Sequence, residues 1–317
     1  MHDSLMIPAC FSMSAAEKCE SLTTITKPGQ CIFISVYRAK FAGRCRLITI
    51  TWRKNLLLHV LSLSVQAIRG SEDDFLCKIE LKPWSWGKKY GSRQFSIEGK
   101  TVDVVWNLQA AKFIGEAEPR SDYYVAVACE QEAVLVVGDL KKDAYRKTRC
   151  RPALIDPMLI SRTEHVFGKK QFLTKLKFND KEKKLREVSI RLITGSSNAN
   201  YFSQSDPNPQ LEIRVEGQLA IQVNHLHWKF RGNDSFHMCG RSKVEICWDV
   251  HDWLFNSGPR YGLFMFKPVS SSPISAPFSP PSSSSLDKEE LAKSLMDEDR
   301  SNAPSSFCLF VYAWILD

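Results

Sequence analysis

Two histidines in the second half of the chain come nearest to a metal-ligand pattern. His225 and His227 stand two positions apart in a segment with strand character, so their imidazoles are expected to point the same way. Such a pair can begin a metal site, which His237 or His251 would have to complete. No carboxylate or third ligand is fixed by spacing. We therefore predict hydrogen-bonded or solvent-facing histidines and no metal.

Asp249, His251 and Asp252 offer the residue types of acid–base catalysis. The sequence contains no G-x-S-x-G nucleophile motif, no P-loop and no G-x-G-x-x-G after a strand. Capping or turn roles are therefore favoured for the two aspartates. The sequence predicts neither an enzyme nor a cofactor.

Positive charge is densest between residues 141 and 151, and a second group follows in a strand-like run at 171–178. The two groups together predict one basic face that binds an acidic partner, with an ordinary solvated surface as the alternative. Tyr90 lies close to Lys89 and Arg93, an aromatic-plus-cation mixture that also suits single-stranded nucleic acid. The predicted face consists of Lys141, Lys142, Arg146, Lys147, Arg149, Arg151, Lys175 and Lys177.

A segment that occurs twice gives the best clue to the architecture. Residues 99–113 (GKTVDVVWNLQAAKF) align without a gap to residues 241–255 (RSKVEICWDVHDWLF), which places Trp106 on Trp248. The same offset places Trp86 on Trp228, and we predict an internal duplication. Core packing is favoured for the paired tryptophans, and a platform for a carbohydrate or another small molecule is the alternative.

The elements that position these residues are mostly strands. Runs such as 46–52, 102–108, 171–178 and 186–192 alternate apolar and polar residues, and Glu98-Gly99 has the composition of a tight hairpin turn. Residues 139–147 predict a short helix with Asp139 as its N-cap. The pattern predicts an all-β fold, an antiparallel β-sandwich built from two duplicated halves with few short helices.

Composition shifts along the chain predict its organisation. A Ser/Pro-rich stretch, which cannot form a core, separates the main body from a very apolar C-terminal run. The predicted segments are a disordered N-terminal arm (1–28), a first β half (29–152), a second β half (153–268), a disordered linker (269–306) and a C-terminal strand that docks on the core (307–317).

The net charge indicates which partners are favoured, and the cysteine spacing indicates the cellular compartment. A net charge of +8 favours anionic partners, although only weakly. The ten cysteines form no C-x-x-C pair, which favours reduced thiols. The N-terminus lacks the pattern of a secretory signal, and the longest apolar run is too short to span a bilayer as a helix. We expect a protein of the cytoplasm or nucleus.

Several long motifs carry a resemblance to a known family. They include KIELKPWSWGKKYGSRQF, EPRSDYYVAV, GDLKKDAYRKTRCRPALI, HLHWKFRGN and VEICWDVHDWLF. With these motifs the chain resembles the plant proteins grouped as domain of unknown function 868, from residue 30 to residue 268, and the final FCLFVYAWILD is also family-like. The resemblance implies a plant protein. It implies no activity, cofactor or catalytic residue.

Three hypotheses for function follow from the sequence. The first is a non-enzymatic interaction module whose basic face binds an acidic protein or nucleic acid. The second is a peripheral module that docks on an anionic membrane. The third is a carbohydrate or small-molecule binder that uses the tryptophan pair. Salt-sensitive binding to RNA rather than to liposomes would separate the first two.

Overall fold

The computed structural model shows a fold made mostly of strands. The two helices in the described part of the chain are short, namely α2 (Lys141–Thr148) and α3 (His251–Phe255). The all-β prediction is confirmed. The predicted arm, almost all of the predicted linker, and Trp86 lie outside the described residues. The structure describes residues 30–41, 43–55, 58–67, 75–81, 89–114, 116–178, 185–194, 208–238, 243–258, 260–269 and 307–316.

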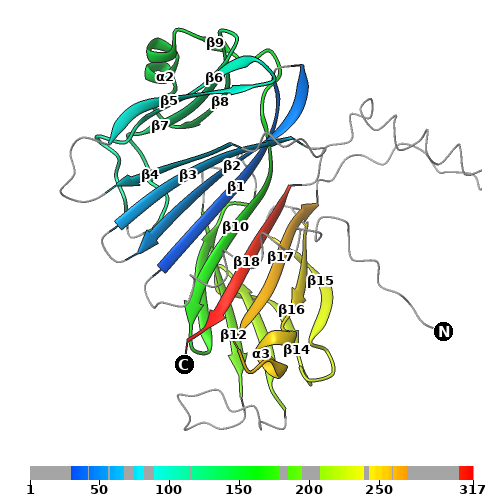
Figure 1. Cartoon of the computed structure of the whole chain (residues 1–317). Coiled ribbons are helices and arrows are strands. Elements are labelled where there is room, and N and C mark those ends of the chain that lie inside the picture. The colour runs from blue at the N-terminus through cyan, green and yellow to red at the C-terminus, as the bar shows by residue number, and fades with distance from the viewer. Residues whose placement is uncertain are drawn as a thin grey trace, which may run out of the picture.

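One nine-stranded sheet runs through the whole molecule (Figure 1). Its order is β15-β16-β17-β18-β10-β1-β2-β3-β4, and all neighbours are antiparallel except β10 and β18. The apolar C-terminal run forms β18, which lies inside this sheet between β17 and β10. The strands are β1 (Gln30–Phe41), β2 (Arg44–Asn55), β3 (Leu58–Ala67), β4 (Phe75–Leu81), β10 (Met158–Gly168), β15 (Arg231–His237), β16 (Lys243–Asp249), β17 (Tyr261–Val269) and β18 (Cys308–Ile315).

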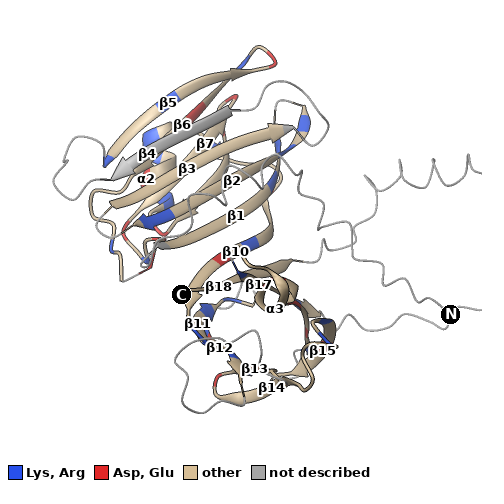
Figure 2. Ribbon diagram, turned by 60° about the horizontal axis from the view of Figure 1, so that its bottom comes forward, with Lys and Arg blue, Asp and Glu red and all other residues tan. Residues whose placement is uncertain are grey.

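Two smaller sheets pack against the ends of the long one. In Figure 2 the strands of the second half follow a ring, from β10 through β18 and β17 to β15 and back along β14 to β11. The first cover contains β5 (Tyr90–Ile97), β6 (Lys100–Asn107), β7 (Tyr124–Cys129), β8 (Glu132–Gly138) and β9 (Arg151–Pro152). The second contains β11 (Gln171–Leu176), β12 (Arg186–Ile193), β13 (Gln210–Val215) and β14 (Gln218–Val223).

Each cover sheet encloses its own hydrophobic core. The first core joins Trp52 and Leu63 of the long sheet to Val104 and Val127 of the first cover. The second core joins Ile246, Phe264 and Val311 of the long sheet to residues of the second cover such as Phe172 and Ile190. The period-two alternation of the strands produces these cores, because every second side chain points to the same layer.

The repeated segments form corresponding hairpins. Trp106 on β6 lies opposite Gly91 on β5, and Trp248 on β16 lies opposite Gly232 on β15. A Cβ atom on Gly91 would approach Trp106 Cζ2 to 2.9 Å, and one on Gly232 would approach Trp248 Cζ2 to 2.4 Å. Both tryptophans belong to the cores, as the core-packing interpretation expects. The duplication itself stays a prediction.

The predicted turn at Glu98-Gly99 joins β5 to β6. Both residues have positive φ, 49° and 75°, which matches the right-handed twist of a two-residue hairpin. The Glu98 carboxylate also binds Arg44 and Arg46 of β2, at 3.2 and 3.0 Å. The Arg46 side chain is buried, so this turn is tied to the long sheet by a partly buried ion pair.

Candidate functional site

The helix α2 lies on the outer face of the first cover sheet, next to β9 (Figure 1). Its buried residue Ala144 packs against Val105, Tyr124 and Ala126 of the sheet. A helix this short presents one narrow face to the sheet, so the remaining positions point away from it. The four basic side chains of the helix are therefore exposed, namely Lys141, Lys142, Arg146 and Lys147.

The start of this helix differs from the prediction. Leu140, not Asp139, is the N-cap, and no side chain caps the helix. Asp139 instead accepts hydrogen bonds from the backbone N–H groups of Asp122 and Tyr123, at 3.0 and 3.1 Å. Burial opposes the charge of this carboxylate, but these hydrogen bonds outweigh it and lower its pKa. Asp139 thus anchors the residues before β7 and leaves the first turn of α2 to solvent.

The end of the helix adds two further cations. Arg149 is the C-cap in the left-handed conformation (φ 56°), and its N–H donates to the carbonyl of Tyr145 at 2.9 Å. Arg151 follows on β9, which pairs with β8. We call Lys141, Lys142, Arg146, Lys147, Arg149 and Arg151 the α2–β9 basic cluster.

Two members of the α2–β9 basic cluster are paired. Arg146 binds Asp143 at 2.5 Å, and Arg151 binds Glu132 at 2.7 Å. The structure shows no ion pair to another described residue for the other four members, Lys141, Lys142, Lys147 and Arg149. These four exposed cations give the outer surface of the first half a local excess of positive charge.

Lys175 and Lys177 lie elsewhere in the molecule. Lys175 is on β11 of the second cover sheet, with its side chain exposed, and Lys177 follows that strand. The helix α2 packs on β6, β7 and β8 of the other cover. The structure therefore does not bring the eight predicted residues together. The predicted single face is two separate groups, because β11 belongs to a different sheet from the one that carries α2.

A polar region that the sequence did not reveal lies where the two halves meet. Arg162 of β10 forms an ion pair with Glu118 of the first half, and its guanidinium lies 4.5 Å from the centre of the Phe33 ring. Two positions along the same strand, Glu164 accepts a hydrogen bond of 2.5 Å from Thr174 of β11. We call Glu118, Arg162, Glu164 and Thr174 the junction cluster.

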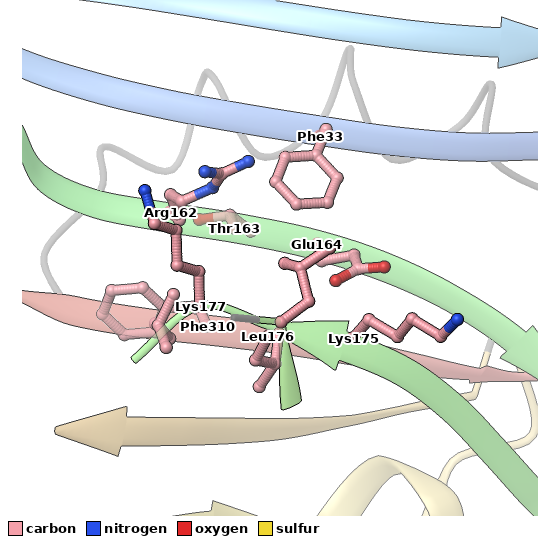
Figure 3. A pocket seen from close by; sticks show the side chains of 10 residues that line it. Phe33, Arg162, Thr163, Glu164, Lys175, Leu176, Lys177 and Phe310 are labelled. Atoms are coloured by element: carbon pink, nitrogen blue, oxygen red, sulfur yellow. The ribbon is translucent and has the colours of Figure 1, made fainter. Parts of the chain in front are cut away.

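The environment of Glu164 disfavours its charge. Burial raises the pKa of this carboxyl to about 7, against the opposing effects of the Thr174 hydrogen bond and of Arg162. Figure 3 shows Glu164, Arg162 and Phe33 around a pocket of about 20 Å³, with Lys175 and Lys177 on opposite sides. That volume holds about one water molecule.

An open cleft of about 740 Å³ adjoins this pocket and shares Lys175 and Leu185 with it. Its walls carry both signs of charge and two exposed apolar side chains. This mixture selects no ligand class by itself. The cleft is lined by residues that include Ile114, Glu116, Arg120, Lys175, Leu185 and Glu187.

Comparison with known proteins identifies the family. A family model described as a plant protein of unknown function (DUF868) matches residues 28–315. The chain belongs to the DUF868 family. No curated protein and no solved structure matches this DUF868 chain.

The histidine pair of this DUF868 protein does not lie on a strand. β14 ends at Val223, and His225 begins a turn with a φ of 55°. The backbone N–H groups of Trp228 and Lys229 both donate to the carbonyl of His225. Among the residues that the structure describes, no group of three histidine, cysteine or acidic side chains is arranged to hold a metal ion.

The aspartates of the same DUF868 chain make local contacts around α3. Asp249 pairs with Arg231 at 2.9 Å and accepts a hydrogen bond from the backbone N–H of His251 at 3.1 Å. Asp252 lies 3.2 Å from His251 Nδ1. The contacts of Asp249 are those expected of a turn or capping residue.

Within the described residues, no helix is long and apolar enough to cross a membrane.

Proposed function

We propose that this plant protein is a non-enzymatic β-sandwich interaction module that binds an anionic partner through the α2–β9 basic cluster. One observation carries the proposal. Four cations of the cluster are exposed on and beside one short helix, with no ion pair to another described residue. Cations in this state keep their full charge for a partner, whereas a paired cation must first give up its neighbour.

The build of the helix also supports the proposal. α2 uses Ala144 to pack on the sheet and directs its basic side chains to solvent, so these side chains add little to the core. Lys147 and Arg149 lie at the C-terminal end of the helix, where positive charge is favourable in any case. That effect does not extend to Lys141 and Lys142 in the first turn, where the helix dipole disfavours cations.

The proposal of a non-enzymatic role is supported by the partners of the candidate catalytic groups. Asp249 is engaged with Arg231 and a backbone N–H, and Asp252 with His251. The chain has no nucleophile motif for them to activate. A turnover assay would test this directly, since hydrolysis of generic ester or phosphate substrates that is abolished by Asp249→Asn would contradict it.

The test of binding uses the full chain and a salt series. Poly(U) RNA, polyglutamate and phosphatidylserine vesicles supply the three common anionic surfaces. A variant with Lys141→Glu, Lys142→Glu and Lys147→Glu should lose binding to the preferred probe. Wild-type binding should weaken as salt rises, because salt screens the attraction and opposes the release of counterions from the anionic surface.

A matched variant separates location from net charge. Lys175→Glu, Lys229→Glu and Lys243→Glu change the net charge equally at exposed positions away from α2. This variant should bind like the wild type. Equal losses in both variants would show that overall charge, not the cluster, causes binding. Failure of the wild type to bind any probe would reject the proposed function.

A further inference from the structure

Exposed aliphatic side chains follow the α2–β9 basic cluster in the chain. Leu154 is 77 % exposed and Ile155 is 57 % exposed, in the segment that leads from β9 to β10. Met158, at the start of β10, is 39 % exposed. A single exposed leucine needs no explanation, but large apolar side chains this close together on the surface are a feature of interaction sites.

Cations flank these aliphatic residues on both sides. Arg149 and Arg151 of the cluster precede them in the chain. After them, Met158 pairs with Arg38 of β1, and the Arg38 guanidinium donates to the Met158 sulfur at 3.7 Å. The segment therefore combines two exposed aliphatic side chains with basic residues that precede them in the chain and with Arg38 of β1 at its far end.

This combination discriminates between classes of anionic partner. Single-stranded nucleic acid is bound by cations together with aromatic rings on which the bases stack, whereas Leu154 and Ile155 present only aliphatic groups. In protein–protein interfaces, the residues that contribute most of the binding energy are usually tryptophan, tyrosine or arginine in fully desolvated pockets, and leucine is under-represented among them. An anionic membrane offers a charged headgroup layer with hydrocarbon beneath it, which matches exposed aliphatic tips bordered by lysine and arginine.

We propose that the anionic partner is a lipid surface, with the α2–β9 basic cluster in contact with acidic headgroups and Leu154 and Ile155 inserted below them. This inference rests on the proposed function and names the partner of the same site. The acidic residue of the helix, Asp143, opposes the contact little, because its charge is already offset by Arg146.

One acidic residue opposes the docking. Asp156 is exposed between Ile155 and Pro157 and would face the same headgroups. Six basic residues in the cluster outnumber the nearby acidic residues Glu132, Asp143 and Asp156, and the neighbouring Glu130 is paired with Lys100. Binding should consequently require a substantial share of acidic lipid and should be weak on neutral vesicles.

The experiment measures co-sedimentation of the full chain with phosphatidylcholine vesicles, with and without phosphatidylserine. Wild-type protein should bind only the vesicles that contain phosphatidylserine. The Lys141→Glu, Lys142→Glu, Lys147→Glu variant should bind at least about a hundredfold more weakly, since each cation near an anionic surface contributes roughly fivefold.

A second variant tests insertion separately from charge. Leu154→Ser with Ile155→Ser should weaken vesicle binding about tenfold, because partial burial of two aliphatic side chains is lost. The same variant should bind poly(U) and polyglutamate like the wild type. Leu173→Ser with Leu219→Ser, which changes two exposed leucines on the second cover sheet, is the matched control and should bind vesicles normally.

The outcomes separate this inference from the proposed function. Vesicle binding that depends on the lysines but not on Leu154 and Ile155 would overturn insertion and leave the proposed function standing. Lysine-dependent binding to poly(U) or polyglutamate with no binding to vesicles would overturn the lipid assignment alone. Absence of binding to all probes would overturn both.

Discussion

Two arginine–carboxylate pairs in this molecule have the same chemistry and opposite surroundings. The Arg146–Asp143 pair on α2 has side chains that are 82 % and 42 % exposed. The Arg162–Glu118 pair in the junction cluster has side chains that are each 19 % exposed. Water screens the first pair, so its members contribute little to folding and remain able to exchange partners. The second pair is held in a medium where the loss of one partner is costly.

The difference separates charged groups that connect parts of the fold from charged groups that are exposed to solvent. Arg162 joins the long sheet to the first half through Glu118, and Glu164 joins it to the second cover through Thr174. Within the described part of the chain, the ion pairs of the α2–β9 basic cluster lie within α2 or within the first cover sheet and connect no two sheets. Stability should therefore respond strongly to changes at the junction and hardly at all to changes on α2.

The largest loss of stability is expected for Arg162→Met. The substitution leaves Glu118 without its cation in a largely enclosed site and removes the contact with the Phe33 ring. We expect the free energy of unfolding to fall by about 3–4 kcal/mol, measured by urea denaturation. Adding Glu118→Leu should restore part of the loss, because an apolar pair replaces a lone charge. A single variant as stable as the wild type would show that the junction pair is no more important than a surface pair.

Glu164 should make the stability of the protein depend on pH. Its pKa is raised from 4.5 to about 7, so the folded state holds the proton more tightly than the unfolded state. The stability from this proton is fully present below pH 4.5 and is lost as the pH rises to about 7. The amide of Glu164→Gln does not ionise, so this variant does not lose stability in that range. From roughly pH 5 to pH 8, its free energy of unfolding should therefore rise by about 2 kcal/mol relative to that of the wild type.

Urea denaturation at several pH values measures this difference. Glu187→Gln is the control, since Glu187 is an exposed carboxylate on β12 of the second cover sheet. The free energy of unfolding of the Glu187→Gln variant should stay close to that of the wild type, because the replaced side chain is exposed. Parallel pH profiles for Glu164→Gln and the wild type would mean that Glu164 ionises as it does in the unfolded chain.

A smaller effect is expected for Asp139→Ala, at the base of the helix that carries the exposed cluster. The variant loses two hydrogen bonds to the backbone N–H groups of Asp122 and Tyr123. We expect a loss of about 1 kcal/mol in the free energy of unfolding, because these N–H groups near the surface can bind water instead. Asp139→Asn keeps an acceptor and should lose less. If Asp139→Ala lowered the free energy of unfolding as much as Arg162→Met, the expectation that buried groups contribute more to stability than exposed ones would be contradicted.

Local patterns in the sequence predicted the local structure well. Alternation indicated the hairpin strands β6 and β16, and Glu98-Gly99 indicated the turn that its positive φ values require. The helix near residues 139–147 was also visible, although the N-cap was wrong. Asp139 binds Asp122 and Tyr123, which are distant in the chain, and no local pattern reports such a contact.

The junction cluster shows why contacts between separate elements could not be predicted from the sequence. Glu118, Arg162 and Thr174 come from separate elements. The contact between Arg162 and Glu118 spans 44 positions of the chain, and the contact between Glu164 and Thr174 depends on where the turn between β10 and β11 falls. One sequence pattern could have indicated the cluster. Arg162, Glu164 and Val166 alternate on one face of a strand, and Val166 is buried, so the two charged residues share a face with a core residue. The residues of the predicted basic face are divided between two places for the same reason. Spacing along the chain does not show that β11 and α2 belong to different cover sheets.

The smallest effect on stability is expected from the largest change of charge. Lys141→Glu, Lys142→Glu and Lys147→Glu together should alter the free energy of unfolding by at most about 1 kcal/mol, because all three side chains are exposed. The effects on the helix dipole partly cancel, since glutamate is favourable at positions 141 and 142 and unfavourable at 147. Urea denaturation of this variant beside Arg162→Met gives the comparison directly. If the α2 variant unfolded as easily as the junction variant, the α2–β9 basic cluster would be part of the fold, and lost binding could no longer be attributed to lost charge.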